Sequence, residues 1–245
     1  ATTSGLNTLA GREIPFPVFD WNSVPLKDSL ENRFHVGNEV WPVFTDVTSM
    51  SLFGRVVLVV GYGPVGKGIA ERARDLGAMV CVADLDAVRL LQAQHHGCEP
   101  VDLDEGVARC QIVVTATGVE GVLGEEQLRL ARPGTIFFNA GHSNREIDID
   151  WLYRQPHQRM KAHIERFDLD DTRIFLLAKG SLLNLAAGSG GCHDLFDFYT
   201  AVMLRGIGWL FDGGAEGASP GVQPYPARLE QEIAGLAVEL RGNLT

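Results

Sequence analysis

Three glycines and one aspartate carry the spacing of a dinucleotide site. Gly61, Gly63 and Gly66 stand in G-x-G-x-x-G order directly after the apolar run VVLVV. Asp84 follows a second apolar run about 20 residues later. Gly61 permits a tight turn, Gly63 lets a pyrophosphate approach the backbone, and Gly66 lets the helix pack closely on the strand. The helix N-terminus favours phosphate, and Asp84 can accept hydrogen bonds from both ribose hydroxyls. The segment therefore predicts an NAD site rather than an NADP site.

Strand and helix patterns alternate from residue 55 onward. The expected strands are 55–60, 79–83, 99–101, 111–115, 135–139, 162–167 and 173–178, and the expected helices are 64–76, 86–96, 104–108, 124–130, 193–212 and 226–241. Asp86 is the expected N-cap of its helix and Gly97 the residue that ends it. Such alternation implies a parallel sheet. We predict an α/β fold, a Rossmann-type doubly wound parallel sheet with helices on both faces, an irregular N-terminal lead-in and two C-terminal helices.

The same patterns divide the chain into three parts. Residues 1–50 are a lead-in that contributes to the cofactor or active site, 51–192 form the NAD-binding Rossmann domain, and 193–245 form a C-terminal helical extension. Prolines disfavour long helices before about residue 26, and residues 27–50 can hold one helix. The first C-terminal helix carries an apolar stripe made of Leu195, Phe198, Tyr199, Val202, Ile207 and Leu210. The stripe predicts packing between subunits of a homo-oligomer, and burial against the chain's own sheet is the alternative.

Composition excludes several classes of protein. A hydrophobic content of 45% is ordinary for a globular protein, and a net charge of −10 argues against a nucleic-acid partner. No apolar run approaches the ~18 residues of a membrane span. Four scattered cysteines without a C-x-x-C pair indicate a reducing compartment, and Cys81 reads as a small core residue. We expect a cytoplasmic protein with no membrane partner and no metal site.

Five segments resemble the cofactor domain of the S-adenosylhomocysteine hydrolase family. They read TTSG, GRVVLVVGYGPVGKGIAERARDLGAMVCVADLDAVRLLQA, VVTATGVEGVLG, NAGHSNREIDIDWL and LLAKGSLLNLAAGSG. The resemblance implies NAD contacts from Thr2, Thr3, Ser4, Asn32, Gly61, Gly63, Pro64, Val65, Gly66, Asp84, Thr115, Thr117, Gly118, Gly141, His142 and Asn184. Arg89 stands where the family typically has Asn near the adenosine ribose. An arginine there can contact a 2′-phosphate, whereas Asp84 favours NAD.

The resemblance also implies a reaction that does not consume NAD. The 3′ hydroxyl of a nucleoside is oxidised to a ketone, which acidifies the neighbouring C4′ proton. A base removes that proton, the 5′ substituent leaves, water adds, and hydride returns to the 3′ carbon. The implied catalytic candidates are Lys27, Glu31, Asn32, His142 and His193.

The departures from the family fall on the catalytic positions. The family's K-x-x-x-D-N element carries the lysine and aspartate of the oxidation step, and here Asn32 matches its Asn while Glu31 replaces its Asp. We place its lysine position on Ser29, with Lys27 two residues earlier. With a one-residue shift in this loop, Lys27 takes the role of the family's lysine. Otherwise, Lys27 and Asp28 are solvated surface charges.

Two further positions differ. The family's Glu before T-T-T-G is Ala1 here, and its late histidine falls on Gly191. His193 lies two residues further on, and it acts either as an acid or base or in a structural role such as helix capping.

Two larger parts of the family have no counterpart in these residues, namely the N-terminal substrate domain and the C-terminal tail. Three functions are therefore open. The first is a nucleoside-modifying enzyme with bound NAD, a hydrolase, dehydratase or epimerase, whose substrate domain can come from a separate chain. The second is a non-catalytic NAD-binding regulatory subunit. The third is a simple dehydrogenase that releases NADH at each turnover.

Overall fold

The computed structural model describes residues 3–190 and 193–242. The fold divides into two compact units, one of residues 33–191 and one that combines residues 1–32 with 192–245. The helix that we expected within 27–50 forms as two consecutive segments, a π-helix η1 (Leu26–His35) and α2 (Val36–Thr48). Residues 33–50, which we placed in the lead-in, thus belong to the unit that contains the sheet.

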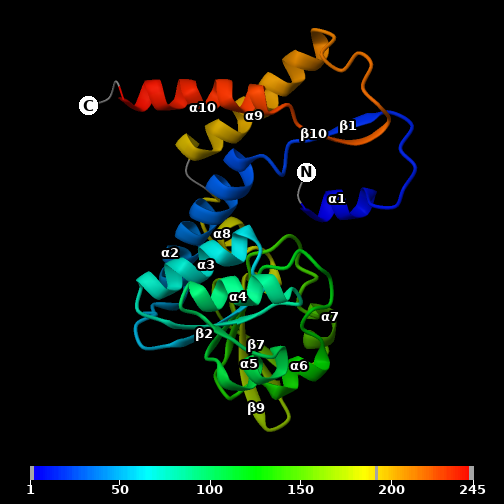
Figure 1. The fold of residues 1–245 in the computed structure, drawn as a ribbon. Helices are drawn as coiled ribbons and strands as arrows, with labels where there is room; N and C mark the ends of the chain where they lie inside the picture. The colour runs from blue at the N-terminus through cyan, green and yellow to red at the C-terminus, as the bar shows by residue number, and fades with distance from the viewer. Residues whose placement is uncertain (1–2, 191–192, 243–245) are drawn as a thin grey trace. The chain divides into compact units, whose positions relative to one another are not determined.

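An eight-stranded sheet forms the centre of the larger unit (Figure 1). Its strands are β2 (Val56–Val60), β3 (Met79–Ala83), β4 (Glu99–Pro100), β5 (Ile112–Thr115), β6 (Ile136–Asn139), β7 (His157–Lys161), β8 (Ile164–Leu169) and β9 (Thr172–Leu177). They lie in the order β4-β3-β2-β5-β6-β9-β8-β7. The six strands from β4 to β9 are parallel and follow the Rossmann order, which reverses between β2 and β5. The predicted fold class is confirmed.

The sheet differs from the prediction at one edge, where β8 and β7 are antiparallel to their neighbours. Only two residues join β8 to β9, and Asp170 has a φ of +43° in this turn. So short a connection permits only an antiparallel pair. All five residues of β7 are exposed, so this strand has no apolar alternation by which the sequence would have predicted it.

Helices cover both faces of the sheet, as predicted. They are α3 (Pro64–Asp75), α4 (Ala87–His95), α5 (Leu103–Arg109), α6 (Glu125–Leu130), α7 (Ile149–Leu152), the 3₁₀ turn η2 (Ala178–Gly180) and α8 (Leu183–Ala186), together with α2. The Asp86 carboxylate caps α4 by accepting hydrogen bonds from the backbone N–H groups of Val88 and Arg89, as expected. Gly97 follows that helix with a φ of +73°.

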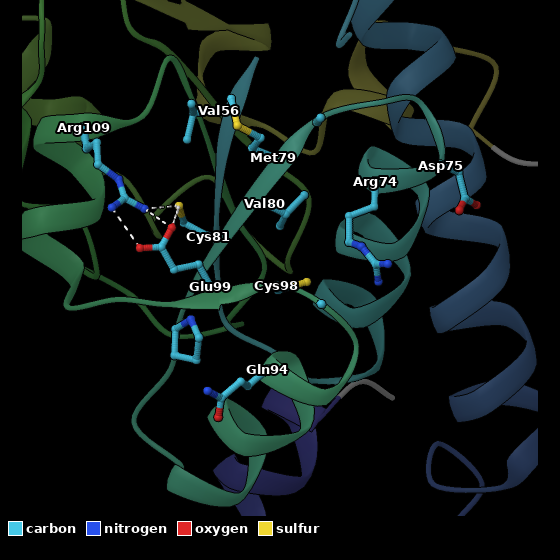
Figure 2. Close-up of a pocket in the computed structure, with 13 residues that line it drawn as sticks. Val56, Arg74, Asp75, Met79, Val80, Cys81, Gln94, Cys98, Glu99 and Arg109 are labelled. Carbon is cyan, nitrogen blue, oxygen red and sulfur yellow. Dashed lines mark hydrogen bonds and ion pairs between the residues drawn. The ribbon is translucent and has the colours of Figure 1, made fainter. Parts of the chain in front are cut away.

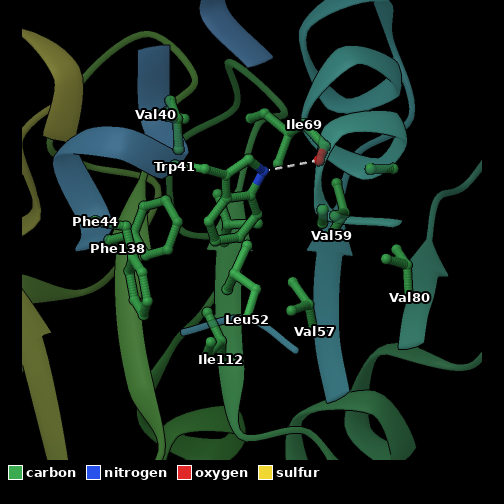
Figure 3. Packing of buried hydrophobic residues seen from close by; sticks show 14 of the residues in the cluster. Val40, Trp41, Phe44, Leu52, Val57, Val59, Ile69, Val80, Ile112 and Phe138 are labelled. Atoms are coloured by element: carbon green, nitrogen blue, oxygen red, sulfur yellow. Dashed lines mark hydrogen bonds between the residues drawn. The ribbon is translucent and has the colours of Figure 1, made fainter. Parts of the chain in front are cut away.

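Alternate residues of each central strand point to opposite faces and build two separate cores. Val57 and Val59 of β2 face the core beneath α2 and α3, whereas Leu58 and Val60 face the core beneath α5, α6 and α7. Trp41 lies at the centre of the first core, where it packs edge-on against Phe44 and Phe138 (Figure 3). The strands are thus covered on both sides, which explains their continuous apolar runs.

The smaller unit has its own apolar centre. It contains α1 (Thr3–Leu9), β1 (Pro17–Asp20), α9 (His193–Phe211), β10 (Gly221–Pro224) and α10 (Ala227–Gly242), and β1 pairs in parallel with β10. Val24, Val202, Tyr225 and Leu229 are buried together. Of the predicted apolar stripe on α9, Val202 is buried and Ile207 and Leu210 are exposed. Among the helices that the structure describes, none has the length and apolar content that a membrane crossing requires.

Candidate cofactor and active site

The glycine turn between β2 and α3 has the geometry that its three glycines predict. Gly61 has a φ of +93°, which an L side chain rarely adopts. A Cβ on Gly66 would lie less than 3.0 Å from the carbonyl oxygen of Gly61, so only glycine lets the helix start here. A Cβ on Gly63 would meet no atom of the described residues within 4 Å. The backbone at Gly63 is therefore open to a ligand. Pro64 and Val65 begin α3, whose N-terminus has no side-chain cap.

Asp84 lies at the carboxyl end of β3 and is tied to this turn. Its Oδ2 accepts a hydrogen bond from the backbone N–H of Tyr62 at 2.6 Å, and its Oδ1 accepts one from Asp86 at 2.9 Å. The Asp84 side chain is only 7% exposed. Arg89 lies beside it, with Nη1 at 3.6 Å from Asp84 Oδ2 and Nε at 3.7 Å from Asp86 Oδ2. The structure therefore places the two residues that bear on cofactor choice in one ion pair.

The ends of β5 and β6 are joined by a buried polar pair. Thr115 is fully buried, and its hydroxyl donates to Asn139 Oδ1 at 3.3 Å. The same oxygen accepts the backbone N–H of Gly141 at 2.7 Å, while Asn139 Nδ2 donates to the carbonyl of Gly180 at 3.1 Å. Asn139 thus fixes the loop that follows its own strand and the turn η2.

A fully buried glutamate links the two loops that follow β5 and β6. Glu146 Oε2 accepts the backbone N–H and the hydroxyl of Thr117 at 2.9 and 2.8 Å. Glu146 Oε1 accepts the backbone N–H groups of Gly118 at 2.9 Å and His142 at 3.0 Å. A Cβ on Gly141 would lie less than 3.0 Å from this carboxylate. Four predicted site residues are thus held together by one residue that the sequence analysis did not single out.

Asn184 of α8 has a polar atom that the described residues leave unsatisfied. Its side chain is 5% exposed, and its Oδ1 is buried without a hydrogen-bond partner among residues 3–190 and 193–242. Its Nδ2 makes only long contacts, to Glu39 Oε2 at 3.5 Å and to the carbonyl of Gly190 at 3.4 Å. A buried amide oxygen without a donor needs a partner, and a carboxamide N–H of a ligand can supply one. Together with the open backbone at Gly63, this atom fits a nicotinamide dinucleotide.

The three candidates Lys27, Glu31 and Asn32 lie together in the smaller unit. Lys27 Nζ is 2.8 Å from Glu31 Oε2 and donates to Asn32 Oδ1 at 3.0 Å. It also lies 4.7 Å from the ring centroid of Tyr199. The i to i+5 period of a π-helix brings residues 27 and 32 to the same face of η1.

This geometry corrects the placement of the lysine position on Ser29. Counted back from Asn32, the chain reads K-x-x-x-E-N, with Lys27 in the lysine position and no shift in the loop. The Lys27 side chain is 12% exposed, so it is not a solvated surface charge. The π-helical winding, which the sequence does not reveal, is what brings its amine to both partners.

For most of the remaining candidates, the side chains lie outside the described part of the structure. Thr2 lies outside the described residues. Thr3 and Ser4 begin α1, and His193 begins α9, but their side chains are outside the described part of the structure. His142 is exposed on the loop after β6, with its backbone N–H held by Glu146.

A separate cavity of about 770 Å³ lies at the opposite end of the sheet (Figure 2). Val56 and Met79, which begin β2 and β3, line it, so it is remote from the carboxyl ends that carry Gly61 and Asp84. On its wall, Arg109 donates to Cys81 Sγ at 2.8 Å. Hydrogen bonds from the Cys110 thiol and from Arg109 lower the pKa of Cys81 to about 7. Cys81 is buried, as predicted, but it has polar partners that an ordinary core residue lacks.

Residues 37–190 match the family described as S-adenosyl-L-homocysteine hydrolase, NAD binding domain. This chain belongs to that family. NAD is therefore the cofactor of this domain, as the spacing of the glycines predicted.

Curated relatives match over nearly the whole chain. The adenosylhomocysteinase of Archaeoglobus fulgidus is 32% identical over 247 residues, which cover 98% of this chain and 61% of the relative. The S-inosyl-L-homocysteine hydrolase of Methanopyrus kandleri is 33% identical, covering 98% of this chain and 58% of its own length. The adenosylhomocysteinase of Thermotoga maritima is 31% identical, with 98% and 61% covered. The chain thus spans about three fifths of the relatives it matches.

Proposed function

We propose that this chain carries the cofactor and oxidation machinery of a nucleoside-modifying enzyme of the S-adenosylhomocysteine hydrolase type. The observation that carries the proposal is the contact of Lys27 with Glu31 and Asn32, in a chain that also holds the NAD turn. A cofactor domain alone would need the turn but not a lysine held in this way. The substrate class is a nucleoside with a leaving group at C5′.

When bound, NAD would supply reversible hydride transfer at the 3′ carbon of the nucleoside. Lys27 Nζ is our candidate for proton transfer at the 3′ hydroxyl of the nucleoside. Glu31 and Asn32 hold the amine in place. Glu31 is one methylene longer than the family's aspartate, so its carboxylate reaches further from the helix backbone. His142 is our candidate for proton transfer elsewhere on the sugar, because its ring is exposed and its backbone is fixed.

The identity of the purine base is left open by the relatives, which include hydrolases named for S-adenosyl- and for S-inosyl-homocysteine. We therefore propose a purine nucleoside 5′-thioether as the substrate. A separate substrate-domain chain and a homo-oligomer joined through α9 and α10 are part of the same proposal. Exposed apolar side chains on these helices support an oligomer, with Leu204 60%, Phe211 88% and Val238 73% exposed.

Lys27→Met tests this function. In heavy water, the protein with bound NAD, assayed together with the proposed substrate-domain chain, should exchange deuterium into C4′ of adenosine or inosine without net NADH formation. Without the amine, the rate of exchange should fall by about 10²–10⁴-fold, which is the usual rate contribution of a positioned acid or base. Mass spectrometry of the recovered nucleoside and absorbance of the reduced cofactor give the two readouts. Lys161→Met, which alters an exposed lysine on β7, is the matched control and should change neither.

The other two functions give different results in the same experiment. A simple dehydrogenase accumulates NADH in proportion to substrate. A regulatory subunit binds NAD and shows neither exchange nor NADH; Ala1 in place of the family's Glu favours either this candidate or a split enzyme. Equal exchange by the parent protein and Lys27→Met would refute our assignment of the amine.

A further inference from the structure

Glu146 has the burial and the hydrogen bonds expected of a charged carboxylate inside the protein. Its side chain is fully buried, and its two oxygens accept four hydrogen bonds, at 2.8 to 3.0 Å. All four donors are neutral backbone amides or a hydroxyl, and both oxygens of an ionised carboxylate can accept them. Burying a charge is costly, and a neutral amide can accept hydrogen bonds at only one of its two polar ends, so the four donors select a carboxylate at this position.

The position of this charge follows from the topology of the sheet. A dinucleotide crosses a Rossmann sheet at the point where the strand order reverses, here between β2 and β5. Asp84 follows β3 and therefore holds the adenosine ribose on one side of that point. The other nucleotide lies on the side of β5 and β6, whose loops are those that Glu146 joins at Thr117, Gly118 and His142.

We propose that Glu146 is a positioning residue that makes the site prefer the oxidised cofactor over the reduced one. The oxidised nicotinamide ring carries a positive charge and the reduced ring does not. A fixed carboxylate beneath the loops of the nicotinamide half therefore attracts only the oxidised form. At the separations of about 10 Å expected across one loop, such an attraction corresponds to roughly tenfold in relative affinity. The inference rests on NAD binding and needs no turnover.

Glu146→Gln tests this by calorimetric titration with NAD and with NADH separately. The amide keeps the shape but removes the charge and turns one donor toward the loop N–H groups, so both affinities should fall. The expected signature is that NAD is weakened roughly tenfold more than NADH. Glu165→Gln is the matched control, because Glu165 is also buried and accepts a hydrogen bond, from the Tyr153 hydroxyl, but lies on β8.

Glu146→Asp keeps the charge and covers the case in which the glutamine variant does not fold. The shorter side chain should weaken both forms of the cofactor equally, with the NAD to NADH affinity ratio unchanged. An unchanged ratio in Glu146→Gln, an equal change of ratio in Glu165→Gln, or a changed ratio in Glu146→Asp would overturn the proposal. If the parent protein binds neither form, the NAD site itself is refuted, whereas normal binding with an unaltered ratio refutes only the role of Glu146.

Discussion

Alanine at Gly66 is expected to abolish measurable NAD binding and to destabilise the larger unit. The new Cβ would lie less than 3.0 Å from the backbone oxygen of Gly61. This oxygen cannot move away, because Gly61 directly follows strand β2. Overpacking of this kind costs about 1–3 kcal/mol of unfolding free energy. The helix N-terminus must also move, so that it no longer meets the phosphates. Calorimetry should show NAD affinity at least roughly a hundredfold weaker, a change of about 2.7 kcal/mol.

Gly63→Ala separates binding from folding. Within the part of the chain that the structure describes, its Cβ would meet no atom within 4 Å, so the melting temperature should not fall, yet the methyl group would occupy the space that the pyrophosphate needs. Gly235→Ala in α10, where a Cβ also meets nothing within 4 Å among the described residues, is the control that should leave NAD affinity unchanged and should not lower the melting temperature. Full NAD affinity in both Gly63→Ala and Gly66→Ala would show that the cofactor does not lie on this turn.

Trp41→Ala is expected to cause the largest loss of stability in the chain. Trp41 is fully buried, its ring lies 5.6 Å from the rings of Phe44 and Phe138, and its Nε1 donates to the carbonyl of Ile69 at 2.9 Å. Removing a buried aromatic side chain costs about 3–5 kcal/mol. A domain that is stable by only about 5–15 kcal/mol would then be close to unfolding under ordinary conditions. Urea denaturation of the parent and the variant measures the difference.

Two further variants serve as comparisons for the stability loss of Trp41→Ala. Trp41→Phe keeps an aromatic ring in the core but removes the indole N–H, so its loss should be smaller than that of Trp41→Ala. Leu91→Ala removes a leucine from the exposed side of α4, where the change should stay within about 0.5 kcal/mol. A loss below about 1 kcal/mol in Trp41→Ala would mean that the core under α2 is not packed as described.

The cofactor turn could be predicted because its signals are local. Gly61, Gly63 and Gly66 lie within six residues of one another, and Asp84 ends the next apolar run. The strands β2, β3, β5 and β6 were predicted within one residue because both their faces are buried, which leaves a continuous apolar run. These parts of the fold need no knowledge of residues far away in the sequence.

The parts that were missed depend on distant partners. The strands β1 and β10 pair although they are about 200 residues apart, and neither has a strong apolar pattern. In the sequence, nothing distinguishes Glu146 from other acidic residues in polar loops. Its role depends on contacts with Thr117 and His142 that only the fold creates. The register of Lys27 could be read by counting back from Asn32, but its contact with Asn32 could not, because an ordinary helix does not bring positions 27 and 32 to one face, whereas the π-helical turn does.

The central claim is that the glycine turn, Asp84 and Asn184 together hold NAD. Isothermal titration of the purified chain with NAD and with NADH tests it most directly, after any cofactor that co-purifies has been removed and identified. We expect saturable binding of one dinucleotide per chain, with heat that disappears in Gly63→Ala. Absence of heat with either form, together with no pyridine nucleotide released from the protein on denaturation, would contradict the account.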